Sequence, residues 1–407
     1  MFLRSSSPGS IWGLFLPLAL CTAATHGFGY FLFPALLPAI RAEHSLTYST
    51  TANIAAVAQV AYVVGSLFAG TFGPALGAGR LTLVSVGITA LGLLALSAVS
   101  SGWWIGAFVA LMSAAAAVNW ASISALAGVY VESKRRGRVL TVAATGSAWG
   151  VCANGVLVSD GLPILKSGGV WLISGLITAA IVVATGLALF RRGALGDPKL
   201  TIVRTVETEN NATNGGVTLR HPAVFFVCGL SVLAGLSTIP YLTYLGAYLE
   251  TEMGNPSTLV GSVWTILGIT GALTGFVVGM IADRYGLTLA LRVIFLAFIA
   301  SAVILAAAPE PPIIYGAGIG FGLMYFTLWG LISTYVNQFL PPGPAMRVIG
   351  FSLVCVGLAA ALGNWMAGQW AEYGHSFADV YVVVACICGV MVVATFAMPT
   401  KRGGDAL

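Results

Sequence analysis

Charged residues are scarce in this 407-residue chain, and their scarcity excludes a water-soluble fold. Only 8% of the residues are charged and 58% are hydrophobic, whereas an ordinary soluble domain carries about 25% charged residues. The 18 Lys and Arg and 13 Asp and Glu are too few to cover a folded surface in water. The solvent must therefore be lipid, and spanning helices use up nearly the whole length.

Several other features are missing, and each absence removes a class of function. All six cysteines lie in apolar runs, which gives them no disulfide framework. A G-x-x-x-x-G-K-[ST] loop is absent, so ATP is not the direct energy source. No carboxylate or thiol accompanies a histidine at membrane depth, as a catalytic or metal site would require. We therefore expect no enzyme activity, no cofactor, no metal site and no nucleic-acid partner.

Long apolar runs are what the chain does have, and they are best explained as transmembrane helices. A lipid-exposed backbone must satisfy its own hydrogen bonds, and these runs are too long and too unalternating for barrel strands. The sequence predicts twelve spans, at about 11–38, 50–72, 80–100, 103–131, 139–159, 169–190, 222–249, 256–281, 288–308, 312–336, 347–369 and 378–398.

The placement of Lys and Arg predicts the orientation of these spans. If both termini are cytoplasmic, 16 of the 18 basic residues fall in cytoplasmic segments, and only Arg41 and Lys166 lie outside. We therefore expect a multi-pass protein of the cell (plasma or inner) membrane with both termini in the cytoplasm. The surrounding partner is the lipid bilayer, and we expect a monomer.

A polar central stretch divides the chain into two similar parts. Residues 191–220 are rich in Gly, Asp, Glu, Asn and Thr, which is typical of a flexible linker. The sequence thus predicts an N-terminal six-helix bundle at 1–190, a cytoplasmic linker at 191–221 and a C-terminal six-helix bundle at 222–407.

An internal repeat supports this division. A shift of 209 positions places Gly70 on Gly279, Gly77 on Gly286 and Arg138 on Arg347, all in predicted cytoplasmic turns. Two similar bundles whose ends all lie on one side are related by an axis along the membrane normal.

The second copy of the repeated turn carries a motif. Gly279-Met280-Ile281-Ala282-Asp283-Arg284-Tyr285-Gly286 resembles the loop signature G-x-L-A-D-R-x-G of the major facilitator superfamily, at one of its two usual places. The first-half counterpart keeps the glycines but has Pro74 in place of the Asp. The resemblance implies an all-α integral membrane protein with twelve transmembrane helices in two pseudo-symmetric six-helix bundles, working as a secondary transporter.

The signature residues are candidates for a conformational latch. An Asp can accept N–H groups at the positive end of a helix dipole in the opposite half, and the resemblance implies that this partner is span five. The candidate latch residues are Gly279, Asp283, Arg284, Gly286, Arg138 and Arg347. The alternative is an ordinary helix-end cap beside a solvated Arg284.

Ionisable groups are almost absent at mid-depth, and His26 is the exception. It lies in Thr25-His26-Gly27-Phe28-Gly29-Tyr30, where two glycines loosen the helix. Histidine changes charge near neutral pH, so His26 is a candidate for binding a proton or an anionic substrate. A neutral histidine bonded to a carbonyl of a neighbouring helix explains it equally well.

Amides and aromatic side chains near mid-depth are the other candidates for a central cavity. Spans three, six, nine and twelve have none of the amides, which fits four outer helices around eight inner ones. Any single Asn or Gln can equally be a hydrogen-bonding link between helices. The candidate cavity residues are His26, Tyr30, Gln59, Asn119, Trp149, Asn154, Tyr241, Tyr244, Tyr325, Trp329 and Asn364.

Together these features predict a secondary transporter that moves a small organic solute by alternating access. The absence of intramembrane Lys and Arg argues against multiply charged anions and favours a monocarboxylate or an amphiphilic neutral compound. Proton coupling through His26 stays open. The alternatives are a drug or metabolite efflux carrier, or a transporter-like sensor without flux.

Overall fold

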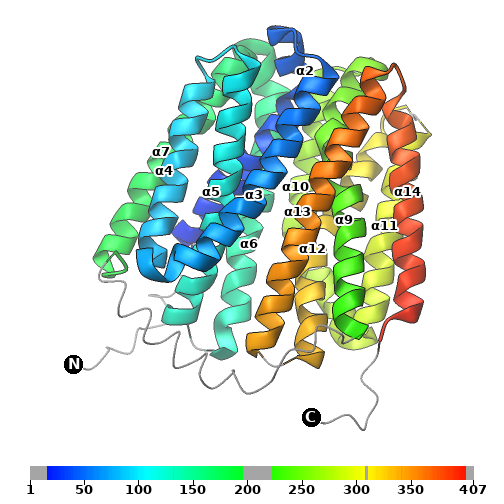
Figure 1. The fold of residues 1–407 in the computed structure, drawn as a ribbon. Coiled ribbons are helices and arrows are strands. Elements are labelled where there is room, and N and C mark those ends of the chain that lie inside the picture. The colour runs from blue at the N-terminus through cyan, green and yellow to red at the C-terminus, as the bar shows by residue number, and fades with distance from the viewer. Residues whose placement is uncertain (1–15, 132, 196–221, 308–309, 341, 400–407) are drawn as a thin grey trace.

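A computed structural model describes residues 16–131, 133–195, 222–307, 310–340 and 342–399, and these residues form a bundle of long helices (Figure 1). The N-terminal helices begin at Leu16, and the C-terminal helices begin at Pro222. The N-terminal helices are η1 (Ala23–Phe31), α2 (Leu32–His44), α3 (Tyr48–Leu76), α4 (Ala78–Leu96), α5 (Gly102–Tyr130), α6 (Ser133–Val156), η2 (Leu157–Gly161) and α7 (Leu162–Arg191).

The C-terminal helices repeat this pattern of long, tightly connected helices. They are α9 (Pro222–Ala247), η3 (Tyr248–Glu252), α10 (Ser257–Tyr285), α11 (Leu287–Ala306), α12 (Ile314–Phe339), α13 (Pro342–Glu372), α14 (Phe377–Ala394) and η4 (Thr395–Ala397). The segments η1, η2 and η3 are π-helical continuations of their neighbours, and η4 is a short 3-10 turn.

Among the described residues, eleven helices are long and apolar enough to cross a membrane. One of them, Val139–Arg191, has 53 residues, about twice the length that a single crossing needs. Lys166 breaks it with a backbone φ of 55°, and Lys166 is the residue that the basic-residue pattern assigns to a loop. The predicted all-α membrane fold is confirmed, and the broken helix accounts for two of the twelve predicted spans.

The repeated glycine pair forms two equivalent turns. Gly77 joins α3 to α4 with φ 88°, and Gly286 joins α10 to α11 with φ 93°. An L-amino acid with a Cβ is strained in this conformation, so glycine permits both sharp reversals. We call the end of the bundle that carries these turns the linker end, because α7 ends and α9 begins there (Figure 1), and the opposite end the far end. That the linker end is cytoplasmic stays a prediction, as do the bounds of the two bundles.

Two antiparallel helix pairs and two smaller contacts account for most of the packing between the N-terminal and C-terminal helices. The pairs are α3 with α13 and α6 with α10, and the smaller contacts are η2 with α10 and α2 with α9. The helices α4, α7, α11 and α14 pack against helices of their own half. They correspond to spans three, six, nine and twelve, the four that lack amide side chains at mid-depth.

Candidate functional site

A small cavity lies between the two halves. It has a volume of about 20 Å³, which is room for about one water molecule. Its polar lining comes from both halves: Tyr30, Gln59 and Ser113 on the N-terminal side, and Thr243 and Asn364 on the C-terminal side. Three of the residues predicted for a central cavity, Tyr30, Gln59 and Asn364, are therefore brought together here.

Asn364 is held rigidly at this cavity. Its backbone carbonyl accepts a hydrogen bond of 2.8 Å from the Tyr244 hydroxyl. The preceding residue, Gly363, lies so close to α9 that a Cβ there would meet Pro240 and Leu236. The side chain of Asn364 is fully buried, yet neither its amide nitrogen nor its amide oxygen has a hydrogen-bond partner among the described residues.

The N-terminal wall of the cavity is built on η1. Gly27 allows α6 to approach closely, because a Cβ on Gly27 would meet the backbone of Gly150. The wider π-helical turn changes the backbone bonding, and the Asn154 side chain donates to the Gly27 carbonyl at 2.7 Å. Further along η1, the Tyr30 hydroxyl donates to the Gln59 side-chain oxygen at 2.7 Å.

His26 belongs to a hydrogen-bonded network in which both of its ring nitrogens have partners when the ring is neutral. The Thr25 hydroxyl donates to the Cys21 carbonyl at 2.9 Å and accepts from Asn119 at 3.0 Å. Its proton is therefore engaged, and His26 Nδ1, 3.3 Å away, is best assigned as the donor to Thr25 Oγ1. His26 Nε2 then accepts from the Tyr62 hydroxyl at 3.3 Å. This arrangement is close to the alternative of a neutral histidine bonded to a neighbouring helix, with the Tyr62 hydroxyl in place of a carbonyl.

Aromatic rings surround this network and continue across the interface. The ring of Tyr62 lies 6.0 Å from His26 and 5.5 Å from Tyr30. From the other half, Tyr325 lies 5.8 Å from Phe31 and 6.4 Å from Trp329. We call His26, Tyr30, Phe31, Tyr62, Tyr325 and Trp329 the aromatic cluster. It offers planar faces beside the cavity.

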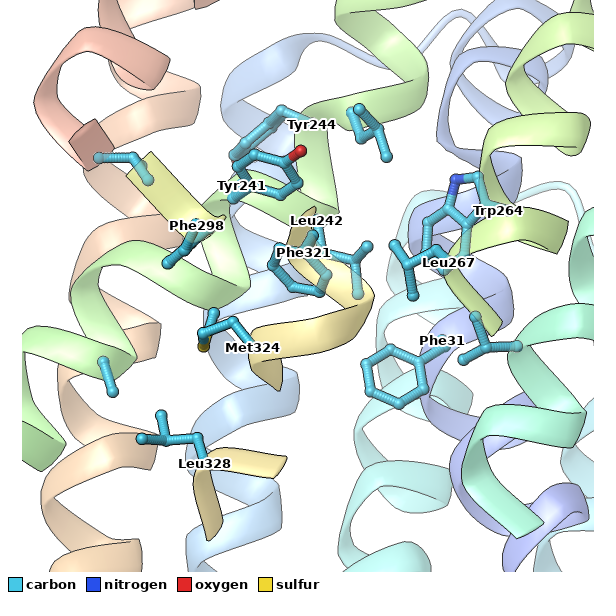
Figure 2. Close-up of a cluster of buried hydrophobic side chains, with 14 of the residues drawn as sticks. Phe31, Tyr241, Leu242, Tyr244, Trp264, Leu267, Phe298, Phe321, Met324 and Leu328 are labelled. Carbon is cyan, nitrogen blue, oxygen red and sulfur yellow. The ribbon is translucent and has the colours of Figure 1, made fainter. Parts of the chain in front are cut away.

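Other sequence candidates lie in the helical core. Tyr241 and Tyr244 are fully buried, and Figure 2 shows them among apolar side chains such as Phe298 and Phe321. The Tyr241 hydroxyl shares a 2.6 Å hydrogen bond with Ser301, and its ring stacks on Phe321. Trp149 lies outside this core, because its side chain is 38% exposed. Asn119 and Asn154 thus make the interhelical bonds that were the alternative explanation for an amide side chain, and Tyr241 makes a similar bond between α9 and α11.

The far end of the interface is closed by hydrogen bonds between the halves. The Glu372 carboxylate accepts the backbone N–H of Ser49 at 2.9 Å, in the first turn of α3. The Gln369 amide donates to the Ser49 hydroxyl at 2.9 Å, and the hydroxyls of Tyr48 and Thr251 lie 3.1 Å apart. We call Tyr48, Ser49, Thr251, Gln369 and Glu372 the far-end clamp.

The signature residues lie at the linker end. Asp283 is exposed in the last turn of α10 and has no hydrogen-bond partner among the described residues. Gly286 forms the turn, Gly279 lies one turn before Asp283, Arg284 is exposed near Tyr285, and Arg347 is exposed on α13. The side chain of Arg138 lies outside the described residues, so the latch stays a prediction.

Sequence reasoning missed Ser113 and Thr243 at the cavity, and all five residues of the clamp. Ser113 is the one hydroxyl in the apolar run 105–118 of α5, which is a weak signal because serines occur in many spans. The clamp residues carry no motif. Their spacing along the chain does not reveal that α3 begins beside the end of α13.

The long apolar helices define a multi-pass membrane protein with a small cavity between its two halves. The sequence model of the Major Facilitator Superfamily matches residues 18–364, and the chain belongs to this family. This is a family of transporters and not of enzymes.

Relatives and solved structures agree with this membership. The chain is 24% identical over 213 residues to the uncharacterized MFS-type transporter YttB of Bacillus subtilis (strain 168), covering 52% of this chain and 50% of that protein. It is 26% identical over 162 residues to the human solute carrier family 67 member A1, covering 38% of each chain. The matches thus span half or less of each relative's length.

Two solved transporters share the fold over their whole length. The nucleoside transporter NupG superimposes with a TM-score of 0.68 at 15% identity, covering 96% of this chain and 100% of that one. The xylose transporter XylE from E. coli, in a partially occluded inward-open conformation, gives a TM-score of 0.73 at 10% identity, covering 96% and 100%. At these identities the likeness concerns the fold alone.

Proposed function

We propose that this protein moves a small, uncharged organic solute across the membrane by alternating access, with the solute bound at the cavity between the halves. The observation that carries the proposal is that one cavity is lined by polar groups of both halves, next to an interface that is hydrogen-bonded across the far end. A rocking motion of one half against the other changes the exposure of such a cavity.

The lining chemistry favours an uncharged solute over the monocarboxylate alternative. No Lys or Arg occurs among the residues that line the cavity, and an anion in an apolar site needs a compensating charge. His26, the nearest candidate, has both ring nitrogens engaged while the ring is neutral. Proton coupling is therefore not needed to explain why a histidine lies at this depth in the membrane.

A cross-linking experiment tests alternating access through the far end. Ser49→Cys and Gln369→Cys, in a chain whose six native cysteines are replaced by Ser, place two thiols where the side chains now meet. Solutes that raise the melting temperature of the purified protein are tested for counterflow in liposomes, which needs no knowledge of a coupling ion. Oxidation should stop counterflow, and reduction should restore it.

The single variants Ser49→Cys and Gln369→Cys serve as matched controls and should be insensitive to oxidation. Counterflow that continues in the cross-linked double variant contradicts the proposed motion. A solute that binds but never exchanges would instead favour the sensor alternative.

A further inference from the structure

If the protein transports a solute as proposed above, the chemistry of the cavity indicates which class of solute binds there. Asn364 is fully buried and lines the cavity, and both of its amide atoms lack a partner among the described residues. Ser113, on the opposite wall, is also buried with an unpartnered hydroxyl. Buried polar groups are nearly always hydrogen-bonded. Several other described side chains have a buried polar atom without a partner, but only Asn364 and Ser113 of this group also line the cavity, and this coincidence on both of its walls points to a ligand.

An asparagine side chain presents a donor beside an acceptor in one plane. Its best partner is a group that offers an acceptor beside a donor, as a carboxamide, a lactam or the edge of a nucleobase does. A carboxylate has two acceptors, so one of its oxygens would face the Asn364 oxygen. An amidinium has only donors, so it would face the Asn364 nitrogen and bring an uncompensated charge.

The side chains around the cavity can pack against the planar part of such a solute. The aromatic cluster supplies planar faces from both halves next to the cavity. The cavity itself holds about one water molecule, which is room for the polar edge of a solute. The two halves must separate before the ring of the solute fits beside that edge. Tyr244 fixes the backbone of Asn364, so the amide is positioned before the solute arrives.

We propose that Asn364 and Ser113 form a recognition subsite for a planar, uncharged solute that carries a hydrogen-bond donor next to an acceptor. Asn364 pairs with both atoms of this edge, and the Ser113 hydroxyl approaches the solute from the opposite wall. The subsite selects amide-like solutes over carboxylates and amidiniums of the same shape.

Three probes of nearly equal shape test the subsite: benzamide, benzoate and benzamidine. Their effect on the melting temperature of the purified full-length protein in detergent gives half-saturating concentrations. Benzamide should bind at least about tenfold better than the other two, the discrimination expected of a bidentate pair. Equal binding of benzoate, or no stabilisation by any probe up to its solubility limit, overturns the proposal.

Asn364→Asp should reverse the preference, because two acceptors then face the solute. Benzamidine should become the best probe, and benzamide should lose about tenfold in affinity. Asn337→Asp, on the exposed linker end of α12, is the matched control and should keep the original ranking. Ser113→Ala should weaken benzamide by a few fold without changing the order of the probes.

Failure of this subsite can be separated from failure of the transport proposal. If Asn364→Asp does not fold, the ranking of probes on the unmodified protein still decides the matter. Counterflow of an uncharged solute, found by its effect on the melting temperature, without benzamide binding would overturn the subsite while supporting transport. Benzamide binding that follows the predicted ranking but gives no counterflow supports the subsite and contradicts transport.

Discussion

The two ends of the interface between the halves are built differently. At the far end, Glu372 and Gln369 of α13 hold the first turn of α3, and Tyr48 meets Thr251. At the linker end, no hydrogen bond joins the halves between residues that the structure describes. This end nevertheless carries the family signature. Side chains that belong to no motif therefore join the halves at the far end, while the motif residues lie at the opposite end.

Of three substitutions, at Glu372, Asp283 and His26, removal of the Glu372 carboxylate should have the largest effect on the opening of the far end. Glu372→Ala takes away a charged acceptor at the positive end of α3. We expect labelling of a Thr243→Cys probe, by an impermeant maleimide added at the far end, to rise about fivefold, because charge-assisted hydrogen bonds are among the stronger ones. The native cysteines are replaced by Ser in this assay.

Asp379→Ala is the control for Glu372→Ala. Asp379 is also a carboxylate at the far end, but it accepts from Trp370 within the C-terminal helices. Its removal changes the local charge without touching the interface, so the labelling rate should stay the same. A similar rise in both variants would show that charge, and not the contact with α3, controls the opening.

Substitution of Asp283 should lower the opening of the far end, which is the opposite of the effect of Glu372→Ala, and by a smaller factor. Its position in the last turn of α10, at the negative end of that helix dipole, does not stabilise its own helix, so a partner elsewhere is expected. If Asp283 latches the linker end when the far end is open, Asp283→Asn should lower far-end labelling of the Thr243→Cys probe about twofold. Unchanged or faster labelling would contradict the latch.

Substitution of His26 should have the smallest effect of the three changes, here measured on counterflow. Because both ring nitrogens are satisfied in the neutral state, His26→Gln should leave the pH dependence of counterflow unchanged and alter its rate by less than about threefold, the loss of one neutral hydrogen bond. Counterflow is measured at two pH values on either side of the ordinary titration range of histidine. A pH dependence that disappears in this variant would show that His26 carries the coupling proton.

Parts of the site could be predicted from sequence, and parts could not. Tyr30, Gln59 and Asn364 were found because amides and tyrosines are conspicuous in apolar runs. The same criterion also selected Tyr241, which bonds Ser301 inside the core. Ser113 was missed because hydroxyls are common in membrane helices, where they usually bond to their own backbone. Residue type alone does not separate a group that faces a cavity from one that links two helices.

The sequence by itself determined the class of fold, because scarcity of charge and the length of the apolar runs leave helices in lipid as the solution. It also determined the equivalent turns at Gly77 and Gly286, since a sharp reversal with positive φ favours glycine. The tertiary structure decided which faces of the helices meet. In lipid a helix is apolar all round, so no amphipathic pattern marks its inner face. The unpartnered amide of Asn364 and the contact of Glu372 with α3 therefore became visible only once the helices were packed.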